Sequence, residues 1–301
     1  MSFQSRLGCW WIRLTMKRKP PGEAALVDFT RRRFNPPGWI VGMHSRGMKI
    51  ERVDSPVKGE WISDSKTVPD DKVIYYLHGG GYISGSAKTG RPLTAPLARQ
   101  MGGVRIFSLD YRLAPEHHFP AGLDDAVAGY RWLLSSGIDP GNISVMGDSA
   151  GGGMTLALAM RLRDAGEPLP AGLVCLSPWT DMTGNSESIK ANAERDPMFV
   201  AEDVHRYADA YLGGQSRLGP LASPLFGNLA GLPPMLVHVG DTEVLLDDAR
   251  SLHEKVRAAG GSSELHVYPS VPHGWHFGAP FVPETQEALR EIAAFIERHG
   301  A

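Results

Sequence analysis

From about residue 72 onward, short apolar runs alternate with longer stretches of helical periodicity. Apolar runs bounded by turn residues predict buried strands, and apolar positions three and four residues apart predict helices. The expected strands are 72–78, 104–110, 142–147, 172–177, 235–240 and 264–269. The expected helices are 90–101, 122–136, 150–165, 247–259 and 283–299. Because continuously apolar strands separated by helices favour a covered parallel sheet, we predict a three-layer α/β sandwich with a mostly parallel central sheet.

Two segments, residues 1–45 and 180–225, do not fit this alternation. Both look helical, and neither supplies a clear strand. A long insertion after a strand often covers a functional site. We therefore expect the two segments to pack together as a helical cap, with Trp10, Trp11 and Leu14 as buried contacts. A peripheral membrane anchor is the alternative for the N-terminal one. The expected division is a cap of 1–45 and 180–225, with a core of 46–179 and 226–301.

Composition and charge limit the possible functions. The 301 residues are 42% hydrophobic and 21% charged, which is ordinary for a globular protein. A net charge of −2 predicts no general affinity for nucleic acid. Residues 1–33 carry eight Lys/Arg and two acids, a balance of +6. Such a basic segment can favour a membrane surface, but we interpret it as a solvated helix face.

The cysteine content and the N-terminal sequence indicate the cellular compartment of the protein. Cys9 and Cys175 form no metal or disulfide pattern, and so few cysteines suggest a reducing compartment. The first twenty residues lack the apolar core and cleavage site of a signal peptide. No stretch approaches the roughly 18 apolar residues of a membrane span. We expect a cytoplasmic protein without stable membrane insertion.

The stretch GDSAGG, residues 147–152, lies between an expected strand and an expected helix. Gly-x-Ser-x-Gly in that context is the nucleophile elbow, a tight turn that exposes a serine hydroxyl at the edge of the sheet. A flexible glycine linker is the simpler alternative. A phosphate loop is excluded, because the lysine that such a loop requires is missing. We therefore predict that Ser149 is a nucleophile.

A second glycine cluster, residues 78–81 (HGGG), follows the first expected strand. Attack on an ester turns its carbonyl oxygen into an oxyanion, which preorganised N–H donors stabilise. The expected donors are the backbone N–H groups of Gly80, Gly81 and Ala150. A flexible loop is the alternative. We expect His78 to position this loop rather than to act as the base.

A serine needs a base, and in this fold class the acid and then the histidine follow the serine in sequence. His273 follows the last expected strand, in a loop with Pro272 and Gly274, and is the expected base. His276 is the runner-up. A zinc pair of these two histidines lacks an evident third ligand. The acid must lie after the strand 235–240, where Asp241, Glu243, Asp247 and Asp248 are the candidates.

Four motifs in order resemble the hormone-sensitive-lipase-like family of α/β-hydrolases, the bacterial family IV esterases. They are HGGG at 78–81, DYRLAPEHHFPA at 110–121, GDSAGG at 147–152 and PHGWH at 272–276, and the resemblance covers about 70–300. It implies a cap over an α/β-hydrolase core, an active-site wall supported by 110–116, no cofactor or metal, and preference for short acyl chains. It also suggests a homodimer.

The resemblance also bears on the acid. Aligning the family's pattern on its downstream aspartate places Asp247 at the second position and Glu243 at the first, where the family usually has aspartate. We therefore expect Glu243 to orient His273, with Asp241 as its rival and Asp247 as a third candidate. For Asp247 and Asp248 the simpler alternative is that they cap the helix that follows.

The predicted function is a serine carboxylesterase that acts through an acyl-enzyme intermediate. The alternatives are a non-catalytic ligand-binding protein on the same fold, or an amidase, lactonase or lipase that uses the same triad. Because 180–215 is rich in charged residues, small soluble esters are favoured over triglycerides.

Overall fold

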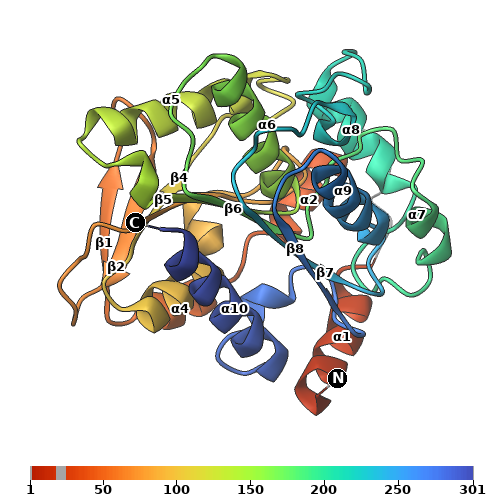
Figure 1. The fold of residues 1–301 in the computed structure, drawn as a ribbon. Coiled ribbons are helices and arrows are strands. Elements are labelled where there is room, and N and C mark those ends of the chain that lie inside the picture. The colour runs from red at the N-terminus through yellow and green to blue at the C-terminus, as the bar shows by residue number, and fades with distance from the viewer. Residues whose placement is uncertain (1, 18–24, 301) are drawn as a thin grey trace.

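The computed structural model describes residues 2–17 and 25–300, in which eight strands form one sheet of order β1-β2-β4-β3-β5-β6-β7-β8 (Figure 1). The strands are β1 Met48–Val53, β2 Gly59–Asp64, β3 Val73–Leu77, β4 Arg105–Leu109, β5 Ile143–Asp148, β6 Gly172–Leu176, β7 Met235–Gly240 and β8 Ser263–Tyr268. The pairings from β4 through β8 are parallel, whereas β1 with β2 and β2 with β4 are antiparallel. The six expected strands are confirmed.

Helices cover both faces of the sheet. They are α1 Phe3–Thr15, α2 Leu26–Arg33, α3 Gly38–Ser45, α4 Arg91–Met101, α5 Ala121–Ser135, α6 Ala150–Asp164, α7 Glu187–Ala191, α8 Asp203–Leu212, α9 Leu246–Ala258 and α10 Pro283–His299. Figure 1 shows α4 and α10 on one face and α5, α6 and α9 on the other. None of the helices in the described ranges is long and apolar enough to cross a membrane.

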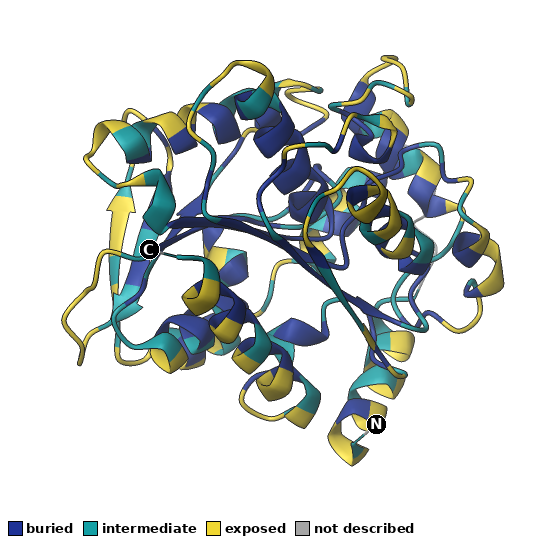
Figure 2. Ribbon diagram, in the orientation of Figure 1, coloured by how far each residue is buried: buried dark blue, intermediate teal, exposed yellow. Residues whose placement is uncertain are grey.

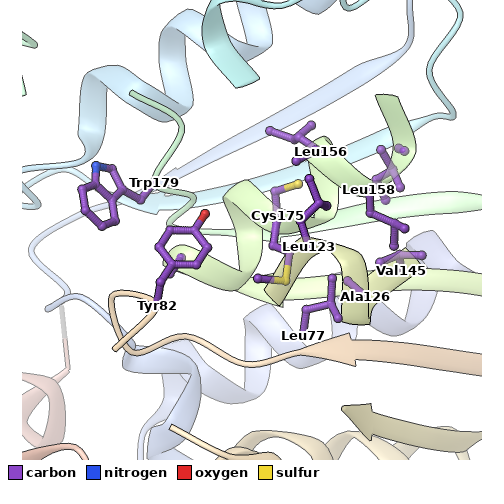
Figure 3. Close-up of a cluster of buried hydrophobic side chains, with 14 of the residues drawn as sticks. Leu77, Tyr82, Leu123, Ala126, Val145, Leu156, Leu158, Cys175 and Trp179 are labelled. Atoms are coloured by element: carbon purple, nitrogen blue, oxygen red, sulfur yellow. The ribbon is translucent and has the colours of Figure 1, made fainter. Parts of the chain in front are cut away.

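The alternation of side chains along the strands creates two apolar cores. In β3, Val73, Tyr75 and Leu77 face the core beneath α5, α6 and α9, whereas Ile74 and Tyr76 face the core over α4 and α10. The sheet is accordingly buried between its helical layers (Figure 2). Figure 3 shows part of the first core, where strand residues meet side chains of α5 and α6. The predicted three-layer α/β architecture with a mostly parallel central sheet is confirmed.

Strands β1 and β2 were not among the expected strands, because neither is a continuously apolar run. β1 reads MKIERV, and its residues are exposed or half-buried. Such exposure is typical of an edge strand that is solvated on one side. The antiparallel pair extends the sheet beyond β4, at the edge opposite β8.

Contacts between the N-terminal helices and the insertion support the proposed division into core and cap. The guanidinium of Arg13 donates to the carbonyl oxygen of Glu194 at 2.9 Å, and the Lys17 ammonium donates to that of Ala193 at 2.6 Å. The hydroxyls of Thr30 and Tyr207 lie 3.0 Å apart in a buried hydrogen bond between α2 and α8.

The expectation that Trp10, Trp11 and Leu14 are buried cap contacts is wrong. All three are exposed, whereas the face of α1 that packs against the protein carries Ser5 and Ile12. The polar contacts of Arg13 and Lys17 hold this part of the chain to the insertion.

Candidate active site

The serine corner lies at the end of a central strand. β5 ends at Asp148, Ser149 takes φ +54° and ψ −120°, and α6 begins at Ala150. A positive φ at a non-glycine residue is strained and clusters at functional sites. A side chain at Gly151 would lie 1.9 Å from the carbonyl oxygen of Leu77, so only glycine allows this close approach. The turn thus presents Ser149 to a cavity of about 430 Å³.

Asp148 joins the serine corner to the glycine cluster. Its Oδ1 accepts hydrogen bonds from the backbone N–H of Gly79 at 2.9 Å and from the hydroxyl of Tyr76. Gly80 has φ +119°, a conformation that favours glycine, and Gly80 and Gly81 line the same cavity as Ser149. The candidate oxyanion donors therefore lie on two loops that one carboxylate holds together.

His78 is buried beneath this loop. Its ring stacks on Tyr111 with centroids 4.1 Å apart, and its Nδ1 lies 2.8 Å from the carbonyl oxygen of Gly79. Burial lowers the pKa of His78 to about 4, so the ring is neutral near pH 7. These contacts are those of a residue that positions the glycine loop.

His273 and Glu243 form a buried pair. The imidazole Nδ1–H donates to Glu243 Oε2 at 2.6 Å, and Glu243 is fully buried. The other carboxylate oxygen, Oε1, accepts from the Ser177 hydroxyl at 2.7 Å and from the backbone N–H of Gly240 at 2.6 Å. Phe199 packs edge-on against the imidazole at 4.7 Å between centroids. Both the carboxylate and the ring are therefore held in one orientation.

The environment of His273 changes its pKa. Burial disfavours the charged imidazolium, but the negative charge and hydrogen bond of Glu243, together with the charges of Asp196 and Asp148, outweigh burial. The pKa of His273 is consequently raised above its ordinary value. A pair of this kind stabilises the imidazolium that forms when histidine accepts a proton from a nucleophile.

The structure gives Asp241, the rival acid, other partners. Its Oδ1 accepts from the backbone N–H of Ser270 at 2.6 Å, and its Oδ2 lies 3.6 Å from the guanidinium of Arg195. These contacts fix the loop after β8 and the insertion rather than the imidazole of His273.

His276, the runner-up base, lies beyond the cavity wall. Its Nε2 is 3.4 Å from Nδ1 of His238, and its ring packs on Trp275. Burial holds the pKa of His276 well below its ordinary value. Because His273 pairs with Glu243 and His276 faces His238, the two histidines do not share a ligand position as a zinc pair would require.

Asp247 and Asp248 lie in the first turn of α9, but the expectation that they cap this helix is wrong. The N-cap position is Leu245, which makes no side-chain capping bond. Asp247 Oδ2 instead accepts from the backbone N–H of Ser188 at 2.7 Å, and Asp248 Oδ2 from that of Thr180 at 2.8 Å. Both carboxylates anchor the insertion to the core.

Three residues that support the His273–Glu243 pair were not predicted from the sequence to have this role. Asp196 is fully buried, and its Oδ2 accepts from the backbone N–H of Val244 at 2.9 Å. Asn192 donates to the carbonyl oxygen of Glu243 at 2.8 Å. Ser177, the third, ends an expected strand, and a polar residue at that edge of a parallel sheet is a usable signal. The other two lie in the insertion, where no periodicity indicates their partners.

Cap residues supply much of the cavity wall. Its lining includes Ser149 and His273 from the core, together with apolar or aromatic cap side chains. The aromatic cap residues are Trp11, Phe34, Phe199 and Tyr207. A mostly apolar cavity with a few converging polar groups suits an uncharged organic ligand that carries a polar centre.

Comparisons with known proteins agree with this geometry. A family model described as alpha/beta hydrolase fold matches residues 74–277. The chain is 41% identical to an acetyl-hydrolase of Streptomyces hygroscopicus, over 79% of this chain and 78% of the relative. It is 36% identical to an esterase of Acinetobacter venetianus, over 79% and 78%.

Solved structures give the same result over the whole chain. A crystal structure of an esterase from the bacterial hormone-sensitive lipase family is similar with a TM-score of 0.90 and 42% identity, covering 100% of this chain and 99% of that one. The esterase EstE5 is similar with a TM-score of 0.89 and 38% identity, covering 99% of each. The chain is therefore a carboxylesterase of the hormone-sensitive-lipase family, built on the α/β-hydrolase fold.

Proposed function

We propose that the protein hydrolyses short-chain carboxylic esters through an acyl-enzyme intermediate on Ser149, with His273 as base and Glu243 as acid. The observation that carries this proposal is the buried 2.6 Å bond between His273 Nδ1 and Glu243 Oε2, beside the cavity that Ser149 lines. Because Nδ1 is committed to Glu243, Nε2 is the ring nitrogen left to accept the serine proton.

The chemistry follows from these positions. The Ser149 oxygen bonds to the acyl carbon while His273 Nε2 takes the hydroxyl proton. The N–H groups of Gly80, Gly81 and Ala150 stabilise the oxyanion. As the ester C–O bond breaks, the imidazolium protonates the leaving alcohol. A water molecule then attacks the acyl-enzyme with the same base, which releases the acid and restores Ser149.

The preference for short acyl chains has two kinds of support. The Streptomyces relative is named an acetyl-hydrolase, and a crystal of EstE5 was soaked with p-nitrophenyl butyrate. The insertion that covers the cavity is also charged, with Glu187, Glu194, Arg195 and Glu202 among its residues. These charged side chains are exposed and lie outside the cavity lining, so the room for an acyl chain is that of the cavity, about 430 Å³.

We expect kcat/KM on p-nitrophenyl esters to fall steeply from butyrate to palmitate, by about a hundredfold or more. A long chain must extend beyond the cavity of about 430 Å³, so its outer methylenes lose the roughly 0.8 kcal/mol that burial of each contributes. A series of acetyl, butyryl, octanoyl and palmitoyl esters below their solubility limits measures this. Equal values for acetyl and palmitoyl esters would contradict the preference.

We expect kcat/KM on a soluble ester to rise with pH and level off above the raised pKa of His273. Only neutral imidazole accepts a proton, so the midpoint should lie above the ordinary value of about 6.5. The same raised pKa stabilises the folded protein at low pH, and this contribution is lost as pH rises through the folded-state pKa. A pH–rate profile measures the midpoint. One at or below about 6.5 would contradict the assigned pairing.

A further inference from the structure

The helix α1 turns its largest apolar side chains outward. Phe3 is 76% exposed, Leu7 54%, Trp10 60% and Trp11 58%. At about 100° per residue, these positions fall within an arc of roughly 100° on the helix surface. An apolar stripe of this width normally faces a protein core. Here it faces solvent, on the outer side of the helix (Figure 2).

Contacts on the opposite side fix this orientation. Ser5 is buried, and the Cys9 thiol lies 3.6 Å from the carbonyl oxygen of Ser270. At the helix start, the backbone N–H and the hydroxyl of Ser2 both donate to the carboxylate of Glu284, at 2.5 and 2.7 Å. Because α1 is tied both to the loop after β8 and to α10, its stripe is presented outward in the folded protein.

The stripe borders the mouth of the active-site cavity. Trp11 is exposed and also lines the cavity, so it stands on the rim. Trp39 is exposed beside the cavity-lining Ile40, and Phe281 is exposed beside the cavity-lining Val282. Three separate chain segments therefore place exposed aromatic side chains next to residues of the cavity wall.

The charged side chains of α1 itself are all positive. Within α1, Arg6 and Arg13 are both exposed, and the helix contains no acidic residue. Outward aromatic and aliphatic side chains combined with neighbouring cations are the features of a helix that lies in a lipid interface.

We propose that the outward face of α1, together with Trp39 and Phe281, binds the surface of an anionic lipid bilayer. The side chains of Leu7 and Trp10 would enter the interface, and the basic residues would contact anionic headgroups. A second copy of the chain fits less well, because a two-fold contact would bring the same basic segment against itself. The cavity mouth would then face the lipid surface. Hydrolysis of lipid-associated esters at this mouth would depend on the proposed function, whereas lipid binding itself would not.

The test is vesicle co-sedimentation of the full chain carrying Ser149→Ala, so that binding is measured without hydrolysis. We expect it to bind phosphatidylcholine vesicles rich in phosphatidylglycerol and to bind pure phosphatidylcholine vesicles much more weakly. Adding Leu7→Gln and Trp10→Gln should lower binding to the anionic vesicles at least about tenfold, because two interfacial anchors are lost. Leu218→Gln is the matched control, since Leu218 is 62% exposed but lies outside α1. The Leu218→Gln variant should bind the anionic vesicles as strongly as the chain that carries Ser149→Ala alone.

Further measurements separate this proposal from misfolding and from the proposed function. With Ser149 restored, the Leu7/Trp10 variant should hydrolyse soluble p-nitrophenyl acetate at the original rate, because neither side chain lines the cavity. The proposal is overturned if the chain does not bind anionic vesicles, or if Leu218→Gln weakens binding as much as the double variant. It is also overturned if light scattering shows a dimer that the double variant dissociates while vesicle binding is absent.

Discussion

Replacing Ser149 with Ala is expected to lower kcat on p-nitrophenyl butyrate by at least about 10⁴. The change removes one oxygen atom, which the mechanism requires as the nucleophile. Alanine keeps the Cβ at φ +54°, so the turn between β5 and α6 should retain its geometry. The oxyanion donors and the base remain, and these account for a small residual rate by direct attack of water. Initial rates with excess enzyme measure the loss.

Three controls make the result specific. Ser135→Ala makes the same chemical change at an exposed position in α5 and should keep full activity. Circular dichroism and the Tm should be unchanged in both variants. A fluorophosphonate probe should label the original protein and fail to label Ser149→Ala. Retention of more than about 1% of the turnover, or an unlabelled original protein, would remove Ser149 from the mechanism.

The core fold and the serine corner were predictable because their signals are local. Buried parallel strands are continuously apolar, and helices carry a period of 3.6 residues, so β3 through β8 and the helices between them follow from short windows of sequence. The elbow motif is also local in sequence, although only Gly147 avoids a contact within the strand–turn–helix unit, whereas Gly151 avoids the backbone of Leu77 in the neighbouring β3. The position of Glu243 opposite His273 needed a family resemblance, because thirty residues separate them.

The cap was less predictable because its contacts join distant segments. The large apolar residues of α1 were expected to be buried on the usual rule that such residues lie inside. The rule runs in one direction only, and here Trp10 and Trp11 are exposed while the small Ser5 is buried. Asp196 was missed for a related reason, since its hydrogen bond to Val244 connects the insertion to a loop that follows β7.

These distant contacts give the cap a second role besides covering the cavity. Asp196 and Asn192 hold the backbone of the loop that carries Glu243, and Phe199 packs against the imidazole of His273. The insertion thereby orients both members of the Glu243–His273 pair. If this pair is the proposed acid and base, movement of the cap would disturb it as well as the shape of the cavity, so cap substitutions should change kcat together with KM.

The acid can be assigned by comparing two amide substitutions. Glu243→Gln is expected to lower kcat by about 10⁴, as the analogous acid-to-amide change does in other serine hydrolases. The amide keeps the shape but loses the charge that stabilises the imidazolium, and its NH₂ group can favour the wrong tautomer of His273. Asp241→Asn should lower kcat less than about tenfold, because Asp241 bonds to Ser270 and Arg195 instead.

Glu243→Asp separates loss of charge from loss of reach. The glutamate bridges the Ser177 hydroxyl, the Gly240 N–H and the imidazole with two oxygens at 2.6–2.7 Å. Aspartate keeps the charge but is one methylene shorter, so it cannot hold all three contacts, and we expect a kcat between those of the original protein and Glu243→Gln. The pH midpoint should remain raised in Glu243→Asp, because the charge beside His273 persists. If Asp241→Asn instead caused the larger loss, with Glu243→Gln nearly unaffected, the acid of the triad would be Asp241.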